Sequence, residues 1–269
     1  MSGANGETVL VTGASSGIGR ELARCFAADG SRLVLTARNT GELQALADEL
    51  NRAHKTEVTI ISADLSLSGT PHNILTELQG RGITVDVLVN NAGFGAWGSF
   101  AELPLARQLE MLQVNITALT ELTGLFLPGM LQRRRGGIMN VASVAGFLPG
   151  PGMAVYYATK AFVLSFSEAL AEELAGTNVT VTALCPGPTA TNFGQVARAD
   201  RTRMVRTARM SAEAVARHGL DSFRKRRVVT VPGLQNRLLV QLIRAVPRSW
   251  VRKLAARFNG LRERQVPPG

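Results

Sequence analysis

The sequence predicts an α/β fold, a doubly wound parallel sheet in a single domain, and two observations support it. First, short apolar runs rich in β-branched residues alternate with stretches in which apolar residues recur at helical spacing. Second, several of these runs are apolar almost throughout, as strands are when helices cover both faces of a parallel sheet. Strand, helix and strand repeated in this way give right-handed crossovers and a doubly wound sheet.

The elements follow one another without an internal repeat or a linker. In the second predicted helix Leu43, Leu46 and Leu50 share one face, as a buried stripe does. The predicted strands are Thr8–Thr12, Arg32–Ala37, Val58–Ser62, Val85–Asn90, Gly137–Val141 and Val179–Leu184. The predicted helices are Gly17–Asp29, Thr40–Arg52, Ser68–Gly80, Glu102–Leu131 and Tyr156–Leu174.

Charge is distributed unevenly along the chain. Residues 1–196 hold 12 Lys and Arg against 16 Asp and Glu, whereas residues 197–269 hold 18 against 4. The net charge of +10 therefore arises in the last quarter of the chain. We expect this basic tail to have a role separate from that of the mildly acidic body.

A glycine-rich turn follows the first strand and opens the first helix. Glycines let the backbone approach a pyrophosphate closely, and the helix N-terminus favours its negative charge. A tight turn without a ligand is the alternative for such a motif alone, but its place in the first strand–helix–strand unit favours a dinucleotide. The expected contacts from this turn are Gly13, Ser15, Ser16, Gly17, Ile18 and Gly19.

The end of the second strand indicates which dinucleotide binds. NAD sites of this architecture place an acidic residue there to bind the ribose hydroxyls. This strand ends in Ala37 and is followed by Arg38, with no carboxylate. A guanidinium matches a 2′-phosphate in charge and in forked geometry. We therefore expect NADP, with NAD as the less favoured cofactor and a solvated loop arginine as the alternative interpretation.

Several short motifs in this order make the chain resemble the short-chain dehydrogenase/reductase family over about residues 7–195, in the subgroup with TGxxxGxG and YxxxK motifs. The match is strong because the whole set occurs in order. Its parts are Thr12-Gly13-x-x-x-Gly17-x-Gly19, Asp64-Leu65, Asn90-Asn91-Ala92-Gly93, Asn115, Ser143, Tyr156-x-x-x-Lys160 and Pro186-Gly187.

Tyr156 and Lys160 lie four residues apart and therefore share one helix face. An ammonium beside a phenol favours the phenolate, so we expect Lys160 to lower the pKa of Tyr156 toward the working range of a general acid or base. Tyr157 has no lysine four residues on, which leaves Tyr156 as the candidate. Ser143 follows the fifth strand and is expected to steady the substrate oxygen.

The resemblance implies an NADP-dependent oxidoreductase that moves a hydride between NADPH and a carbonyl or an alcohol. It also implies that Asn115 supports a proton relay from Lys160, and that Lys160 binds the nicotinamide ribose. A non-catalytic NADP-binding sensor on the same fold is the alternative, although such proteins typically lose the tyrosine or the lysine. The further cofactor contacts implied are Asp64, Leu65, Asn91, Tyr156, Lys160 and Thr189.

Aromatic and apolar residues fall near the loops expected to cover the nicotinamide. They favour an apolar ketone or an acyl-type substrate, and ordinary core packing is the alternative. We expect a substrate lid at about residues 188–227. The apolar residues concerned are Phe94, Trp97, Phe147, Met153 and Phe193.

The tail departs from the family. We expect a seventh strand at Arg227–Pro232 to complete a Rossmann-type domain of residues 1–232, followed by a basic amphipathic extension of residues 233–269 with helices near 234–246 and 248–259. Leu234, Leu238 and Leu242 form one apolar stripe, and Trp250 and Leu254 belong to another. The extension either packs on the body or binds an anionic membrane surface. A homo-oligomer, dimer or tetramer, is expected from the family.

Other classes of site have little support. Cys25 and Cys185 are isolated, which suits a reducing compartment, and His54, His72 and His218 lack ligand spacing, so no metal is expected. No signal peptide, membrane-spanning run or nucleic-acid-binding motif is evident. We expect a cytoplasmic protein that can lie against a membrane.

Overall fold

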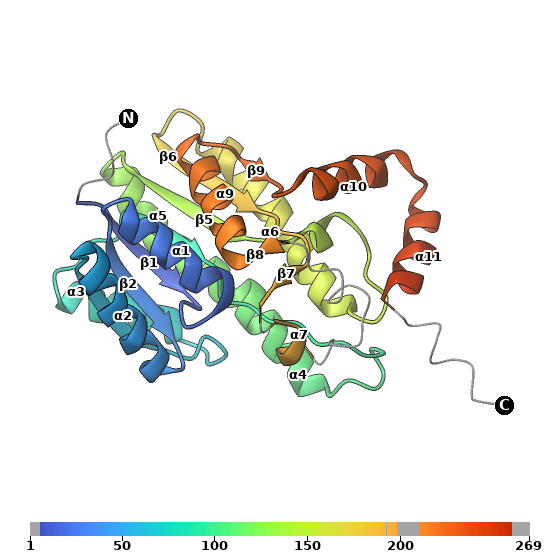
Figure 1. The fold of residues 1–269 in the computed structure, drawn as a ribbon, viewed down its shortest axis with the longest axis horizontal. Helices are drawn as coiled ribbons and strands as arrows, with labels where there is room; N and C mark the ends of the chain where they lie inside the picture. Colours follow the sequence, from blue (N-terminus) through green and yellow to red (C-terminus); the bar gives the residue numbers. More distant parts are fainter. Residues whose placement is uncertain (1–5, 192, 198–209, 260–269) are drawn as a thin grey trace.

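The computed structural model describes residues 6–191, 193–197 and 210–259. Within them the main sheet has seven parallel strands in the order β3-β2-β1-β4-β5-β6-β9 (Figure 1). The chain proceeds outward from β1 to β3 and then returns to place β4 on the other side of β1, which opens a crevice at their carboxyl ends. The strands are β1 Thr8–Thr12, β2 Arg32–Ala37, β3 Val58–Ser62, β4 Val87–Asn90, β5 Gly136–Val141, β6 Val179–Leu184 and β9 Val229–Thr230.

Helices cover both faces of this sheet, which explains why the central strands are fully buried (Figure 1). On one face the cluster around Leu22 and Phe26 joins α1 (Gly17–Ala28), α2 (Thr40–His54) and α9 (Ala212–Arg224) to the strands. On the other, the cluster around Ile74 and Leu122 joins α3 (Thr70–Gly80), α5 (Ala118–Gln132) and α6 (Ala154–Glu173) to them. The predicted doubly wound α/β fold is confirmed.

The long helix before β5 contains an irregular turn. The predicted helix Glu102–Leu131 is found as α4 (Leu105–Leu112), a π-helical turn η1 (Gln113–Thr117) and α5. Such turns are frequent at functional sites, and this one carries Asn115. In the described part of the chain, Leu105–Arg133 is also the one helix long and apolar enough to cross a membrane. Its Leu122 and Phe126 are buried against the sheet, which is the position of a core helix.

The range expected for the lid, residues 188–227, includes a helix that packs in the core. A two-residue strand β7 (Thr189–Ala190) pairs with β8 (Met210–Ser211), and α7 (Phe193–Val196) follows β7. From Ala212 onward, however, α9 packs in the core, where Phe223 meets Phe26 edge to face with ring centroids 6.2 Å apart. Residue 192 and residues 198–209 of the expected lid lie outside the described residues. The bounds expected for the lid therefore include a core helix, α9.

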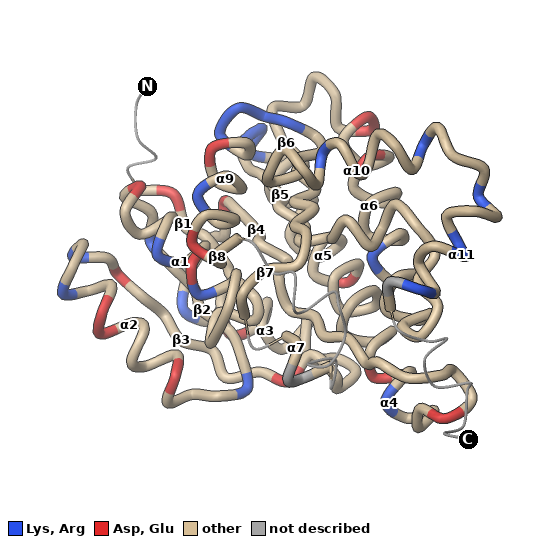
Figure 2. Tube along the Cα trace, turned by 45° about the vertical axis from the view of Figure 1, so that its right-hand side comes forward, with Lys and Arg blue, Asp and Glu red and all other residues tan. Residues whose placement is uncertain are grey.

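The C-terminal helices α10 (Leu234–Ala245) and α11 (Arg248–Phe258) project to one side of the sheet (Figure 1). Val240 is the one buried residue of α10. The stripe expected to pack on the body is largely exposed, since Leu234 is 70% and Leu242 63% accessible. Packing on the body is therefore confirmed only for a narrow strip of this extension. Figure 2 shows basic positions along α10 and α11, and residues 234–259 contain no acidic residue.

Candidate active site

The turn after β1 forms a close-fitting backbone cradle. Gly13 and Gly17 have φ of 65° and 56°, a left-handed conformation that side chains rarely adopt. A Cβ on Gly19 would overlap the side-chain amide of Asn91 and the carbonyl oxygen of Gly13. All three glycines are therefore required by conformation or by close approach.

The N-terminus of α1 points its amides into this cradle. The first hydrogen bond within the helix runs from Arg20 N–H to the Ser16 carbonyl at 3.3 Å, so the amides of Gly17, Ile18 and Gly19 precede the helical ladder. Ser16 caps the helix without a side-chain hydrogen bond. Amides of this kind suit a pyrophosphate, and the cradle therefore fits a dinucleotide.

Asn91 closes the cradle from the adjacent strand end. Its side-chain amide donates to the carbonyls of Thr12 at 2.9 Å and Gly13 at 3.2 Å, while its backbone N–H donates to Thr12 Oγ1 at 3.0 Å. These bonds tie β4 to the turn after β1. Asn91 thus positions the glycine turn, in addition to lining the cavity as expected.

The far end of the nucleotide crevice carries Arg38 and Asp64. Arg38 is exposed at the cavity wall, directly after β2. Burial disfavours the charged form of the Asp64 carboxyl. Hydrogen bonds from Ser66 and the positive charge of Arg38 favour the charged form more strongly, so the pKa of this carboxyl lies below its usual value. An anion and a cation therefore lie side by side where the adenosine half of a dinucleotide would end.

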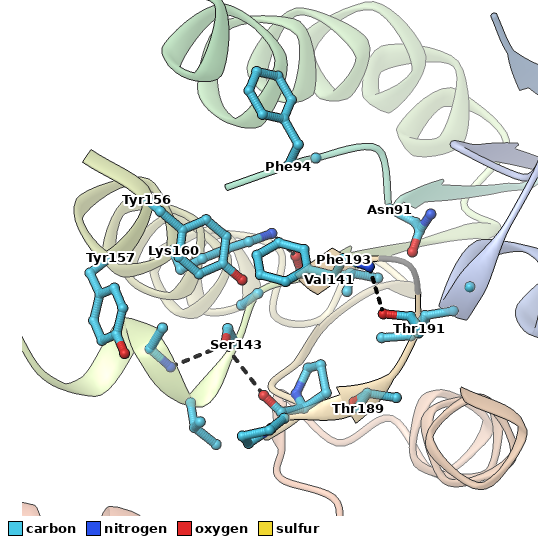
Figure 3. Close-up of a pocket in the computed structure, with 18 of the residues that line it drawn as sticks. Asn91, Phe94, Val141, Ser143, Tyr156, Tyr157, Lys160, Thr189, Thr191 and Phe193 are labelled. Atoms are coloured by element: carbon cyan, nitrogen blue, oxygen red, sulfur yellow. Dashed lines mark hydrogen bonds between the residues drawn. The ribbon is translucent and has the colours of Figure 1, made fainter. Parts of the chain in front are cut away.

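Ser143 and Tyr156 line the same cavity as Arg38 and Asp64, and Figure 3 shows the part around these two catalytic candidates. Ser143 caps a short 3₁₀ helix, Val144–Phe147, where its Oγ accepts from Ala145 N–H at 3.1 Å and donates to the Pro186 carbonyl at 3.3 Å. Tyr156 is on the first turn of α6 and is 8% exposed. The ring of Phe193 lies against it, with the two centroids 5.1 Å apart.

Lys160 lies one turn further along α6 and is buried with Asn115 beside Gly93. Its Nζ donates to the Val141 carbonyl at 2.7 Å. Asn115 holds the main chain at Phe94 from both sides, accepting from its N–H at 3.1 Å and donating to its carbonyl at 3.0 Å. A Cβ on Gly93 would lie 3.1 Å from Asn115 Oδ1 and 3.5 Å from Lys160 Nζ. A side chain at this position would therefore crowd Asn115 and push it by a few tenths of an ångström.

The expectation about the pKa of Tyr156 is wrong for this structure. Burial raises the pKa of its phenol well above the usual value, and a hydrogen bond with Ser143 opposes this only in part. Burial also lowers the pKa of Lys160 to about 8. Lys160 Nζ is 5.9 Å from the centre of the Tyr156 ring, and desolvation is the largest cause of the shift in the pKa of the phenol.

Most predicted residues converge on one cavity of about 980 Å³, a volume that suits a large organic ligand. Asn115 and Gly19 support it from behind, and Phe94 and Phe193 line it among the aromatic residues considered. In the described part of the chain, no cluster of His, Cys, Asp or Glu is suited to a metal ion. The predicted residues that line the cavity are Gly13, Ser15, Ser16, Gly17, Ile18, Arg38, Asp64, Leu65, Asn91, Ser143, Tyr156, Lys160 and Thr189.

Sequence reasoning missed one wall of this cavity. Side chains from α10 and α11 line it together with Ser143 and Tyr156, and Tyr157 and Asn259 line it as well. Trp97 and Met153 instead belong to the apolar cluster behind Tyr156, and Phe147 lies under the Arg244 guanidinium at 5.9 Å. The helical period of α10 and α11 was visible in the sequence, but not the surface that they face.

The fold and the site define a class of protein: an oxidoreductase that binds a nicotinamide dinucleotide at the carboxyl edge of a parallel sheet, next to a buried tyrosine and lysine and a partly buried serine. Residues 7–202 match the family model described as short chain dehydrogenase. The chain belongs to this family, as its motifs predicted.

Solved and curated relatives agree with this assignment. A short-chain dehydrogenase from Sphingobium yanoikuyae, solved with NADPH, is 34% identical with a TM-score of 0.79, and 98% of each chain is covered. A bulky-bulky ketone specific alcohol dehydrogenase from Comamonas testosteroni is 31% identical with a TM-score of 0.75, covering 98% of this chain and 97% of the other. A very-long-chain 3-oxoacyl-CoA reductase of Laccaria bicolor is 38% identical over 65% of this chain, which spans about half (53%) of the relative.

Proposed function

We propose that this protein uses NADPH to reduce apolar ketones or acyl-type carbonyl compounds, and that it catalyses the reverse oxidation of the corresponding alcohols. The observation that carries this proposal is the continuity of the cavity. Arg38, Tyr156 and Ser143 line it together with apolar side chains of α10 and α11.

The chain's own residues account for the handling of the proton. Bound NADPH supplies a hydride to the carbonyl carbon. Tyr156 retains its proton at neutral pH, because burial raises its pKa, and donates it to the carbonyl oxygen as negative charge builds there. Ser143 Oγ–H turns from the Pro186 carbonyl to that same oxygen and stabilises the developing charge.

Lys160 and Asn115 act behind the tyrosine. The Lys160 ammonium, held by the Val141 carbonyl, donates to the nicotinamide ribose and keeps a positive charge near the phenol. Asn115 fixes the Phe94 main chain beside Lys160 and supports the path by which Tyr156 regains its proton. Both roles are part of the proposal.

The preference for NADPH over NADH rests on Arg38. The residue is exposed directly after β2, and this strand ends without the acidic residue that would bind a free ribose hydroxyl. A guanidinium there pairs with a 2′-phosphate through charge-assisted hydrogen bonds.

A substrate screen tests the proposal. Purified protein is mixed with NADPH and with ketones or 3-oxoacyl thioesters of increasing apolar size, and nicotinamide absorbance is followed. Consumption that depends on the carbonyl compound supports the proposed function. Tight NADPH binding without consumption by any of these compounds would favour the sensor alternative and contradict the proposal.

We also propose that the outer face of α10 rests on an anionic membrane surface. Leu234 and Leu238 are 70% and 54% exposed, and residues 234–259 hold six basic and no acidic residues. Sedimentation with phosphatidylglycerol vesicles should exceed that with phosphatidylcholine vesicles, and a Leu234→Ser, Leu238→Ser double variant should reduce it. Equal sedimentation with both lipids, or a dimer in gel filtration that this double variant dissociates, would contradict the proposal.

A further inference from the structure

The pair α10–α11 bridges the cavity and is fastened mainly at its two ends. Between these ends it buries little, since Val240 in α10 and Val251 and Ala255 in α11 are its buried apolar residues within the described part of the chain. A helix pair with so few core contacts depends on its attachments for its position. Asn236 and Asn259 lie at these two ends, and Arg237 also donates to the Val231 carbonyl, at 2.9 Å, near the first of them.

Asn236 fixes the start of α10 to the loop after β6. A Cβ on Gly187 would lie 2.5 Å from Asn236 Oδ1, so the asparagine side chain rests directly on this glycine. Its Nδ2 donates to the Pro232 carbonyl at 2.7 Å. The beginning of the pair therefore lies in direct contact with the Pro186-Gly187 motif at the edge of the site, and its hydrogen bond to Pro232 is local.

Asn259 fixes the end of α11 to three separate segments of the body, and it is only 1% exposed. Its Nδ2 donates to the Pro151 carbonyl at 2.8 Å. Its Oδ1 accepts from the Tyr157 hydroxyl at 3.4 Å, and its backbone carbonyl accepts from Trp97 Nε1 at 3.0 Å. A buried amide bonded at both ends is costly to displace, because opening breaks several hydrogen bonds together.

The space closed by this contact is apolar and continuous with the active site. Tyr157 and Asn259 line the same cavity as Tyr156. Opposite them the helix pair contributes a wall without a charged group until Arg257 at its end. The apolar residues of this wall are Leu239, Leu242, Ile243, Val246, Val251 and Leu254.

We infer that Asn259 holds α10 and α11 over the cavity through its hydrogen bonds with Tyr157 and Trp97, a contact called the latch below. Held in this position, the helix pair selects carbonyl substrates that bear an apolar chain long enough to reach this wall. The inference rests on the proposed function, which it deepens by naming the substrate class. Each methylene that is transferred from water onto the wall should raise kcat/KM about fourfold. Asn259 and Tyr157 are positioning residues, since they act through the helices.

The experiment compares a homologous series of straight-chain methyl ketones in wild type, Asn259→Ala and Tyr157→Phe. Gln241→Ala, which removes an exposed amide from α10, is the matched control. We expect wild type and the control to favour long chains. In Asn259→Ala the ratio of kcat/KM for the longest ketone to that for the shortest should fall about tenfold, through KM rather than kcat. Tyr157→Phe should shift the ratio in the same direction by less. An equal loss for every chain length, or an unchanged ratio, would overturn the latch.

A second readout separates the latch from the proposed function. Trp97 and Trp250 are the two tryptophans of the chain, so Trp250→Phe leaves Trp97 as the sole reporter. In that background Asn259→Ala should shift the Trp97 emission to longer wavelength as the indole becomes exposed to water. If no ketone consumes NADPH but this shift occurs, the proposed function fails and the latch stands. If the emission does not change, the latch itself is contradicted.

Discussion

Lys160 Nζ lies 5.9 Å from the centre of the Tyr156 ring and donates its hydrogen bond to the Val141 carbonyl, at 2.7 Å. The two side chains are therefore close without being paired. Burial acts on both in the direction of the neutral form, raising the pKa of the phenol and lowering that of the ammonium to about 8. Tyr156 thus keeps its proton at neutral pH, while the pKa of Lys160 lies close enough to neutral pH for its charge to change with moderate alkalinity.

The pH dependence of reduction should follow Lys160. Below pH about 8 the side chain is an ammonium, and above it the neutral amine dominates, so the charge that supports the phenol and the ribose is lost as pH rises. We expect kcat/KM for NADPH to be level below pH about 8 and to fall about tenfold for each further pH unit. Lys160→Arg, which stays charged, should remove this decline even though its rate is lower. A decline that persists unchanged in Lys160→Arg would show that another group titrates.

Arg38 should distinguish the two cofactors. Arg38→Ala removes a charge-assisted contact to the 2′-phosphate, so we expect the Kd for NADPH to rise about tenfold to a hundredfold, while that for NADH changes little. Arg52→Ala, another exposed arginine at the end of α2, serves as the control for a general loss of positive charge. Both constants can be measured by calorimetric titration. Equal weakening of NADPH and NADH in Arg38→Ala would refute the role of Arg38.

Gly19 should tolerate no side chain. Gly19→Ala places a methyl group on Asn91 and on the Gly13 carbonyl, so we expect the free energy of unfolding to fall by about 1–3 kcal/mol and NADPH affinity to drop more than tenfold. The control is Gly124→Ala, in an exposed turn of α5 with no atom near the added methyl group, which should stabilise the protein slightly. Denaturant unfolding and nucleotide titration check both. Normal NADPH binding by Gly19→Ala would show that the cradle is not the nucleotide site.

Local patterns predicted most of the sheet. The bounds of β1, β2, β3 and β6 agree with the predicted runs, because each is a mostly apolar run rich in β-branched residues that ends at a turn. The expected seventh strand shrinks to Val229–Thr230, since only those residues pair with β6. The helix predicted through Asn115 was right in extent, but hydrophobic period could not reveal its π-helical turn.

Contacts between distant segments were beyond the reach of such patterns. Tyr157 looked like a mere neighbour of the catalytic tyrosine, and its partner Asn259 lies 102 residues away. The amphipathic period of α10 predicted an apolar face but not that part of it lines a cavity. The raised pKa of Tyr156 was missed for the same reason, because its burial depends on Phe193 and on other segments brought together only by folding.

The most direct test of the account is Tyr156→Phe, which keeps the ring against Phe193 and removes only the transferable proton. With a ketone that wild type reduces, we expect kcat to fall by roughly 10²–10⁴-fold. The Kd for NADPH, measured by calorimetry on the same sample, should change little because the cradle at the N-terminus of α1 is intact. A Tyr156→Phe variant that binds NADPH and still reduces the ketone at the wild-type rate would contradict the assignment of Tyr156 as the proton donor.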